Sequence, residues 1–600
     1  MAQTRQKRRL SATVALATWL GLGLATPIIV SFYSPDIVGD AVEAAPSDAF
    51  TITEPVVIAG TPNIRIERGT IALVDQQGLP VPMTALGLGP AAGHNVRLFN
   101  AVVAIGGQHP DPQGAQGQGA QGIVAPLVEA LISGRYETLS LRRTTVTMKV
   151  LGDTPETITD VKADVSLRRR GLVTIKGTGV LRGQSISVDA TASAAQLERL
   201  QNGTTRLPIK VSVKCAHIDL AFDGRLSMSD GEIGLRGQGE LAVPSIRQAA
   251  RWFGAYWPSG PGLRNAAIRG EMSLLRQNLM FEKATVRMDG NEATGVLAMR
   301  GDAPRPVITG TLAYRTIDTK PYFASHDTAA LPAEPFSWSS LAAGVLTVPL
   351  GMHLDADVRI SADKVVLGGV EFGRSAATVA LKDGRLLADL AELKFNGGEG
   401  GGQITADFTG YLPKFTVRGK LEHVDAGALS SSLMGRGVAQ GHLLQGRAHI
   451  VADIAGSGAT LQDVLKGLAG KFVVRLSDGV RLGLDLRGLA AASRLNEVTG
   501  WELATRGATG FDQMDLRLVL RDGTVLTESA DGRSGDGIWS ATGFVNLLSN
   551  RIDLRLTQTA TTPSGPPGAT TMPLAVLEVR GPLDKPSIRY GGEAERLLPR

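Results

Sequence analysis

The stretch GSGATLQDVLKGLAGKFVVRLSDGVRLGLDLRGL, residues 456–489, shows the two sequence patterns that decide the fold. Its first part predicts a short amphipathic helix capped by Thr460, because apolar residues recur at spacings of three and four. Gly467 and Gly470 end this helix. The next residues, KFVVRL, alternate apolar and polar side chains from Phe472 onward and therefore predict a strand.

Asp478 and Gly479 follow that strand and predict a tight turn, because both tolerate the backbone that a chain reversal needs. The stretch is interpreted as a helix followed by a hairpin. Helical patterns are few elsewhere, and the remaining candidates are residues 123–133, residues 245–253 with Ser245 as the N-cap, residues 427–434 and residues 486–495.

Outside these segments the dominant pattern has a period of two. In MHLDADVRI, residues 352–360, one face carries Leu354, Val358 and Ile360 while the other carries charged residues. This alternation is typical of antiparallel strands with one apolar and one wet face, and it predicts a mainly β fold. A few short helices cannot cover the apolar face of so large a sheet, so the sheet must fold over on itself, close, or bind something apolar.

An internal repeat supports a modular sheet. ATVRMDGNEATG, which begins at Ala284, resembles AELKFNGGEGGG, which begins at Ala391, 107 residues later. The same offset relates Pro306 to Pro413. Both copies predict a strand, a Gly-rich turn, a second strand, a proline, a third strand and a short exit, which is a duplicated β-meander.

The N-terminal region predicts a membrane anchor. Residues 10–33 contain no charged residue, and a helix of this length is roughly 36 Å long, enough to cross a hydrocarbon core of about 30 Å. Basic residues within residues 1–9 favour a cytoplasmic N-terminus, with the rest of the chain on the far side. The alternative is a cleavable signal peptide. The long apolar run and the distance to the small residues Ala44 and Ala45 favour the anchor.

Composition and motifs give no support for catalysis. The formal charge of +5 comes largely from residues 1–9, so the body is nearly neutral, which argues against a nucleic-acid partner. Cys215 is the only cysteine, so no internal disulfide is possible. The GxGxxG at residues 117–122 arises within the low-complexity Gly/Gln segment 110–122 and predicts no dinucleotide cofactor.

Candidate metal and acid–base groups are equally unsupported. His442 and His449 are separated by Gly446, which favours strand–turn–strand over a shared metal site. Asp355 and Asp357 share one face of a strand, as paired acids of a glycosidase could, but solvated alternation on a wet face explains them better. We therefore predict no catalytic residue, no metal and no cofactor.

The opening stretch resembles the C-terminal signature of the AsmA family. The residues that carry the resemblance are Leu468, Gly470, Val474, Leu476, Asp478, Gly479, Gly483, Asp485 and Leu486. The similarity extends to the alternating strands after PFSWSSL at Pro335 and to the ending LEVRGPLDKPSIRY. It suggests the following organisation: residues 1–9 a cytoplasmic tail, 10–33 a transmembrane anchor, 34–210 an N-terminal β-rich region, 211–334 a β-repeat region, 335–590 the AsmA-like C-terminal region, and 591–600 a disordered tail.

The resemblance implies a protein of the Gram-negative inner membrane whose body is periplasmic. It also implies an elongated, repetitive, mostly antiparallel β-sheet folded into a groove with an apolar interior. Members of the family are associated with moving phospholipid between membranes and with outer-membrane integrity. The implied partners are phospholipids, the inner membrane through residues 10–33, and outer-membrane or assembly proteins.

The expected function is therefore lipid handling, with phospholipid transfer toward the outer membrane. Two alternatives stay open: a non-enzymatic scaffold or regulator of outer-membrane protein assembly, which would pair strands with its clients, and a periplasmic hydrolase. The expected lipid-groove residues are Leu354, Val358, Ile360, Phe472, Val474, Leu476, Met514, Leu516, Leu518, Ile552, Leu554 and Leu556. The alternative for each of them is a place in the core of packed sheets.

Overall fold

A computed structural model describes a chain that is mainly β-strand, with a few short helices, as the alternating sequence predicts. The described residues are 37–39, 42–44, 49–52, 56–58, 64–74, 80–81, 95–105, 138–148, 156–167, 171–193, 206–229, 232–252, 262–275, 278–301, 305–323, 354–367, 370–434, 444–458, 461–493, 499–500, 507–535, 537–546, 549–560, 573–582 and 586–590.

The chain divides into two compact units. Unit 1 contains residues 1–257, 263–289 and 293–310, and unit 2 contains residues 258–262, 290–292 and 311–600. The expected regional boundaries at residues 211 and 335 come from sequence similarity and differ from this structural division.

The strands of unit 1 are β1 (Ile37–Gly39), β2 (Val42–Ala44), β3 (Ala49–Ile52), β4 (Val56–Ile58), β5 (Ile64–Val74), β6 (Pro80–Val81), β7 (Asn95–Ile105), β8 (Thr138–Met148), β9 (Glu156–Leu167), β10 (Leu172–Leu181), β11 (Gln184–Ser193), β12 (Leu207–Cys215), β13 (Asp219–Ser229), β14 (Glu232–Val243), β15 (Ala266–Leu275) and β16 (Asn278–Met288). Helix α4 (Ile246–Trp252) also belongs to it. β17 (Asn291–Arg300) and β18 (Val307–Asp318) contribute residues to both units.

The strands of unit 2 are β19 (Asp355–Leu367), β20 (Val370–Phe372), β21 (Ser375–Lys382), β22 (Arg385–Phe395), β23 (Gly398–Asp407), β24 (Lys414–Asp425), β25 (Leu444–Ser457), β26 (Ala469–Leu482), β27 (Thr499–Gly500), β28 (Thr509–Phe511), β29 (Gln513–Arg521), β30 (Thr524–Ser534), β31 (Gly537–Asn546), β32 (Arg551–Thr559), β33 (Ala575–Pro582) and β34 (Ser587–Tyr590). Its helices are α5 (Lys320–Phe323), α7 (Ala426–Met434), α8 (Leu461–Lys466) and α9 (Leu486–Ser493).

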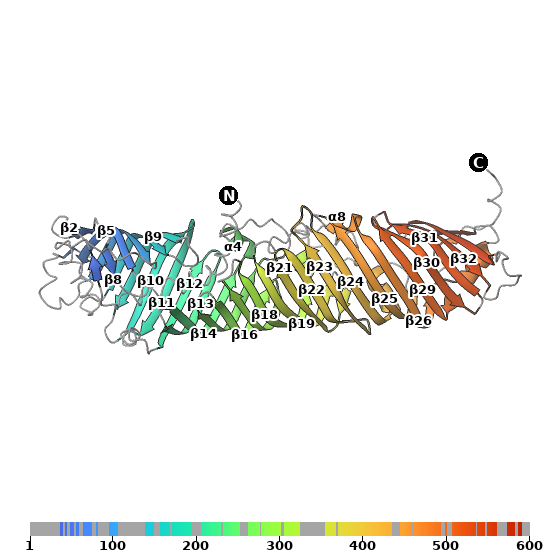
Figure 1. The fold of residues 1–600 in the computed structure, drawn as a ribbon, viewed down its shortest axis with the longest axis horizontal. Coiled ribbons are helices and arrows are strands. Elements are labelled where there is room, and N and C mark those ends of the chain that lie inside the picture. The colour runs from blue at the N-terminus through green and yellow to red at the C-terminus, as the bar shows by residue number, and fades with distance from the viewer. Residues whose placement is uncertain are drawn as a thin grey trace. The chain divides into compact units, whose positions relative to one another are not determined.

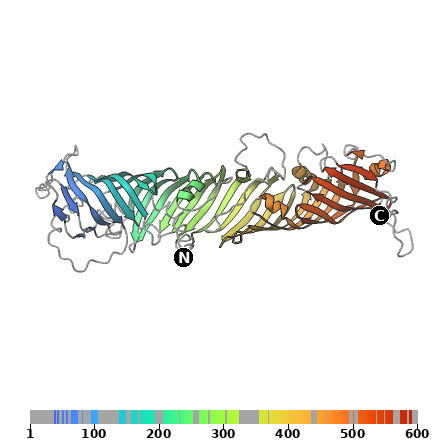
Figure 2. The same ribbon diagram turned by 90° about the horizontal axis from the view of Figure 1, so that it is seen from above.

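Within each unit most strands pair with their neighbours in chain order, as the succession from β21 to β26 shows (Figures 1 and 2). Among the described residues, the paired strands run antiparallel, as predicted, apart from one pair. β7 and β8 run parallel, with Val96 opposite Leu139. A parallel pair needs a crossover connection. Here that connection is residues 106–137, which lie outside the described residues together with the helix expected over 123–133.

The internal repeat folds as predicted in both copies. The first copy is β16, a turn at Asp289–Gly290, β17, Pro306, β18 and α5. The second is β22, a turn at Asn396–Gly397, β23, Pro413, β24 and α7. Each turn places two residues in the left-handed backbone region, which the Asx–Gly sequence favours.

The predicted helices at 245–253, 427–434 and 486–495 are confirmed as α4, α7 and α9, with shorter bounds. Ser245 Oγ accepts a hydrogen bond from the amide of Gln248 (3.3 Å), so it caps α4 as expected. Asp425 caps α7 through the amide of Ala428 (2.8 Å). The capping role expected of Thr460 lies outside the described residues.

The predicted turn at Asp478–Gly479 is wrong. Both residues have positive φ, 57° and 78°, but β26 continues through them from Ala469 to Leu482. At a register shift with the neighbouring strand, three residues of β26, Asp478 to Val480, lie opposite the single residue Gly446 of β25. The Asp–Gly pair therefore forms a β-bulge rather than a chain reversal, because pairing resumes on its far side.

Glycines allow close backbone approach where neighbouring strands of unit 1 meet. Gly224 of β13 lies directly opposite Gly237 of β14. A Cβ at Gly224 would lie 2.6 Å from the Cα of Gly237 and 2.6 Å from Cζ of Phe222. No side chain fits in that space, so glycine at this position is a packing requirement.

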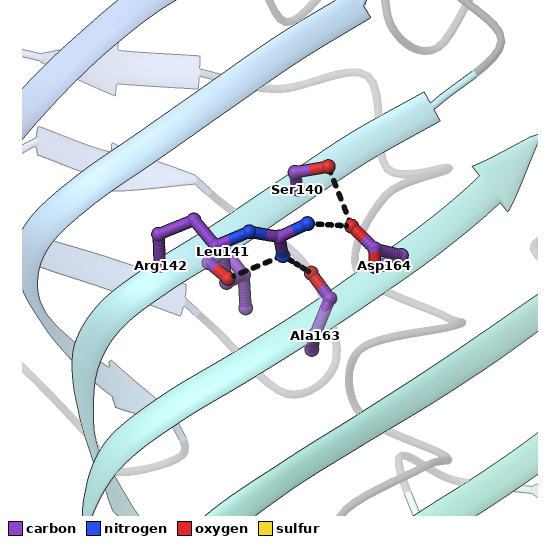
Figure 3. A network of polar contacts seen from close by, with 5 residues as sticks. All are labelled: Ser140, Leu141, Arg142, Ala163 and Asp164. Carbon is purple, nitrogen blue, oxygen red and sulfur yellow. Dashed lines mark hydrogen bonds and ion pairs between the residues drawn. The ribbon is translucent and has the colours of Figure 1, made fainter. Parts of the chain in front are cut away.

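A polar network ties β8 to β9 in unit 1 (Figure 3). The guanidinium of Arg142 donates to the carbonyl oxygens of Leu141 (2.9 Å) and Ala163 (3.1 Å) and to the carboxylate of Asp164 (2.6 Å). The buried Ser140 donates to the same carboxylate at 2.6 Å. The network lies beside a register shift between Leu141 and Thr144, where backbone pairing is interrupted.

Candidate functional site

The apolar side chains of unit 2 line up across eight strands. Residues directly opposite one another on β19, β21, β22, β23, β24, β25, β26 and β29 form a row that we call the central row: Ile360, Ala377, Leu390, Gly402, Gly419, Ala452, Phe472 and Leu518. A second row on the same face contains Val358, Val379, Ala388, Ile404, Val417, Ile454, Gly470 and Leu520. Together these rows define the apolar face of unit 2.

The side chains of this face are half-buried, with the exception of Leu520 at the end of the second row, which is 4% exposed. Every member of the central row keeps part of its surface accessible, and the same holds for Val417 and Ile454 in the second row. Aliphatic side chains in a closed protein core are normally inaccessible. The apolar face is therefore incompletely covered along these eight strands.

The opposite face of the same strands is charged and balanced. Ion pairs join residues directly opposite one another: Arg385 with Asp407, Arg418 with Asp453, and Arg475 with Asp515. Farther along the sheet, Arg580 on β33 pairs in the same way with Asp553 on β32. The hydrogen bond from Arg475 lowers the pKa of Asp515. The central row contains no ionisable residue, whereas the opposite face combines these ion pairs with the exposed apolar side chains of Leu387, Val451 and Val473.

Part of unit 2 does form a closed core. Leu476 on β26, Leu577 on β33 and Leu486 on α9 are almost inaccessible and belong to one cluster of buried side chains. Helix α9 packs against β33 and β34, and α7 packs against β24 and β25.

The structure distributes the predicted groove residues over these two environments. Leu476 lies in the closed core. The other expected residues are half-buried: Leu354, Val358, Ile360, Phe472, Val474, Met514, Leu516, Leu518, Ile552, Leu554 and Leu556. Six of these pack against the closed core, namely Val474, Met514, Leu516, Ile552, Leu554 and Leu556. Phe472 lies opposite Leu518, Val474 opposite Leu516, and Leu476 opposite Met514, so the register brings these predicted residues together.

Further residues of the face were absent from the prediction. They are Val379, Leu386, Ala388, Leu390, Ile404, Phe415, Val417, Ile450 and Ile454. The alternation in KFTVRGKLEHV, residues 414–424, carries the same signal as the segments that were selected. It is interrupted by Gly419, which weakens the periodicity without changing the face.

Unit 1 has an apolar face with the same alternation, but it is closed. Leu207, Leu226, Leu235, Leu274 and Leu279 form a row across β12 to β16, and none of them is more than 6% exposed. Unit 1 also holds a hollow of about 900 Å³, which is lined by the ion pairs Lys176–Asp189 and Lys210–Asp223 and by parts of Val211 and Phe222. Five basic and three acidic residues line it, so its lining is net positive.

The described residues offer little for metal or acid–base chemistry. No three His, Cys, Asp or Glu side chains in the described part of the chain gather as metal ligands. The His423 and His449 rings pack edge to face with centroids 4.6 Å apart, while His442 lies outside the described residues. Asp355 accepts a hydrogen bond from the amide of Asp383 (3.1 Å), whereas Asp357 is exposed on the polar face.

No family model, no curated protein and no solved structure matches this chain. The resemblance to the AsmA family accordingly stays a prediction from the residue pattern. The expected anchor, residues 10–33, lies outside the described residues, and within those that are described no helix is long and apolar enough to span a membrane.

Proposed function

We propose that this protein handles lipid and holds acyl chains against the apolar face of unit 2. The observation that carries the proposal is the uncharged surface formed by the central row and its neighbour, in which every residue except Leu520 is half-buried. Burying one methylene group against such a surface gains about 0.8 kcal/mol, so an acyl chain is a natural occupant.

The extent of the face fits that occupant. Eight strands at a spacing of about 4.8 Å span roughly 34 Å, and one bilayer leaflet contributes a hydrocarbon layer of roughly 15 Å. A single acyl chain lying across the strands would therefore cover only part of the face. Several chains, or the two chains of one phospholipid, have room beside one another.

The rest of the proposal follows the family resemblance. We place the body of the chain in the periplasm, anchored in the inner membrane by residues 10–33, with a binding role rather than a catalytic one. Phospholipid transfer toward the outer membrane and a contribution to outer-membrane integrity are the processes that this placement favours. Outer-membrane or assembly proteins are the expected protein partners.

The decisive experiment is lipid quantification. Residues 36–600 are exported to the periplasm, purified without detergent, and extracted for mass spectrometry of phospholipid against protein. One or more phospholipids per chain support the proposal. A well-folded sample free of phospholipid contradicts it and favours the scaffold alternative, which is then tested by crosslinking to protein partners.

A further inference from the structure

The two units present the same sequence alternation but differ in how far their apolar faces are accessible. In unit 1, Val211 and Phe222 lie opposite each other on β12 and β13 and are 3% exposed in both cases. In unit 2, Val417 and Ile454 lie opposite each other on β24 and β25 and are half-buried. The closure of unit 1 extends to Met272 and Phe281 on β15 and β16.

Glycines show what fills the space over each face. A Cβ at Gly239 in unit 1 would lie 2.7 Å from Sδ of Met272, so the Met272 side chain already covers that glycine. The side chain of Phe222 covers Gly224 in the same way. In unit 2 the side chain of Ile454 covers Gly470 at 2.8 Å from a Cβ there, whereas the nearest atoms to a Cβ at Gly419 are the backbone oxygen of Gly401 at 3.2 Å and a Cα at 3.8 Å.

This difference has a direct consequence for an apolar ligand. Side chains in unit 1 occupy the space where an acyl chain would lie, and displacing them would break close-packed contacts without gaining new buried area. The half-buried side chains of unit 2 gain burial when an acyl chain covers them. The two faces therefore differ in affinity for hydrocarbon although their residue patterns match.

We propose that acyl chains are held only along unit 2, and that the apolar face of unit 1 is a sealed core that excludes them. This inference rests on the proposed lipid-handling function and limits where the lipid lies. It predicts that the amount of lipid per chain is set by the accessible rows of unit 2.

Photocrosslinking tests this with three matched phenylalanine positions in the full-length chain. Phe222→p-benzoylphenylalanine reports on the face of unit 1, Phe472→p-benzoylphenylalanine reports on the apolar face of unit 2, and Phe544→p-benzoylphenylalanine reports on an exposed position of the polar face. Cells are labelled with ³²P-phosphate and irradiated, and the purified protein is examined for covalently attached ³²P-phospholipid.

We expect phospholipid at position 472 at least tenfold above positions 222 and 544. Comparable labelling at 222 and 472 would overturn the confinement to unit 2 while leaving lipid handling intact. Absence of phospholipid at all three positions in folded protein would instead contradict the proposed function, so the two failures are distinguishable.

A second experiment with smaller substitutions keeps the inference testable if the p-benzoylphenylalanine variant at position 222 does not fold. Ala190→Cys in unit 1 and Ala452→Cys in unit 2 are nearly isosteric and are made in a Cys215→Ser chain. Ala190 is 1% exposed, whereas Ala452 is half-buried. N-pyrenylmaleimide should alkylate position 452 at least tenfold faster than position 190 in native protein, and equal rates contradict a sealed unit 1.

Discussion

Phe472 on β26 and Leu518 on β29 lie directly opposite each other, although 46 residues separate them in the sequence. Both are half-buried on the apolar face of unit 2. Cross-strand neighbours of this kind have Cβ atoms about 5 Å apart, so the two side chains form one apolar surface. A polar substitution at either residue should therefore disturb this apolar surface while leaving the protein folded.

Leu518→Asp should reduce bound phospholipid several-fold while leaving the protein folded. The reason is that a charge on a half-buried site stays hydrated in the free protein but must be desolvated when an acyl chain covers it. Phospholipid per chain and circular dichroism provide the two measurements. Val519→Asp, one residue along on the opposite face, is the matched control and should keep its lipid.

Leu577→Asp should behave differently, because Leu577 is fully buried in the closed core of unit 2. Burying an unpaired carboxylate costs several kcal/mol, so this variant should unfold unit 2. Limited proteolysis distinguishes it from Leu518→Asp. If both variants unfold equally, the accessible face and the closed core are energetically alike, which contradicts the proposed binding surface.

Ala452→Phe should block lipid without introducing charge. Ala452 lies between Gly419 and Phe472 in the central row, so a larger ring can extend over the glycine. We expect little change in thermal stability and at least a two-fold loss of bound phospholipid. Ala190→Phe is the contrasting variant: overpacking the sealed core of unit 1 typically costs about 1–3 kcal/mol, and it should leave lipid content per folded chain unchanged.

Gly224→Ala should destabilise unit 1 by about 1–3 kcal/mol, because its Cβ would overlap the backbone of Gly237 and the ring of Phe222. Urea unfolding monitored by hydrogen exchange of β13 and β14 measures the loss. Gly510→Ala is the control, since no atom outside its own neighbourhood lies within 4 Å of a Cβ there. A neutral Gly224→Ala would show that the two strands can move apart.

The Arg475–Asp515 pair should make a small pH-dependent contribution to stability. Because the pKa of Asp515 is lowered in the folded state, its contribution is present above the pKa of an unfolded aspartate, about 3.9, and is lost as the pH falls through the folded value. The pair is partly exposed, so we expect about 0.5 kcal/mol at pH 7. Urea unfolding of Asp515→Asn at pH 7 and pH 2 should show that difference at pH 7 alone, and Arg475→Met should abolish it.

Arg142→Met should lower the free energy needed to separate β8 from β9 by about 1–2 kcal/mol. The reason is that two backbone carbonyl oxygens and the carboxylate of Asp164 would lose the guanidinium that donates hydrogen bonds to all three. Arg142→Lys should restore only part of this, since an ammonium group cannot reproduce the planar fork. Amide exchange in the two strands is the measurement. Lys176→Met, which removes the exposed ion-pair partner of Asp189, should change the free energy of opening measured by amide exchange by less than about 0.5 kcal/mol.

The sequence predicts the identity and face of many strands because a period of two fixes which side chains share a face. Leu354 to Ile360 and Met514 to Leu520 fold as expected on this basis. The same pattern does not reveal whether a face is sealed. Closure depends on how large side chains such as Phe222 and Met272 pack across several strands, and such contacts join strands whose pairing register is not encoded locally.

Two local errors have equally physical causes. Asp478–Gly479 has the backbone of a turn, but strands on both sides continue to pair across it, so tertiary pairing converts a turn signal into a bulge. The parallel pair of β7 and β8 was missed because alternation is the same for both strand directions. The length of residues 106–137 between these strands was the available clue to a crossover.

The repeated meander described above makes the size of the sheet easy to change. Each strand of a copy pairs with strands adjacent in the chain, so a further copy can be inserted without rebuilding distant contacts. Three added strands would widen the sheet by roughly 14 Å. Because the width of the sheet follows the number of meanders, natural selection can tune its reach and carrying capacity by altering the number of copies alone.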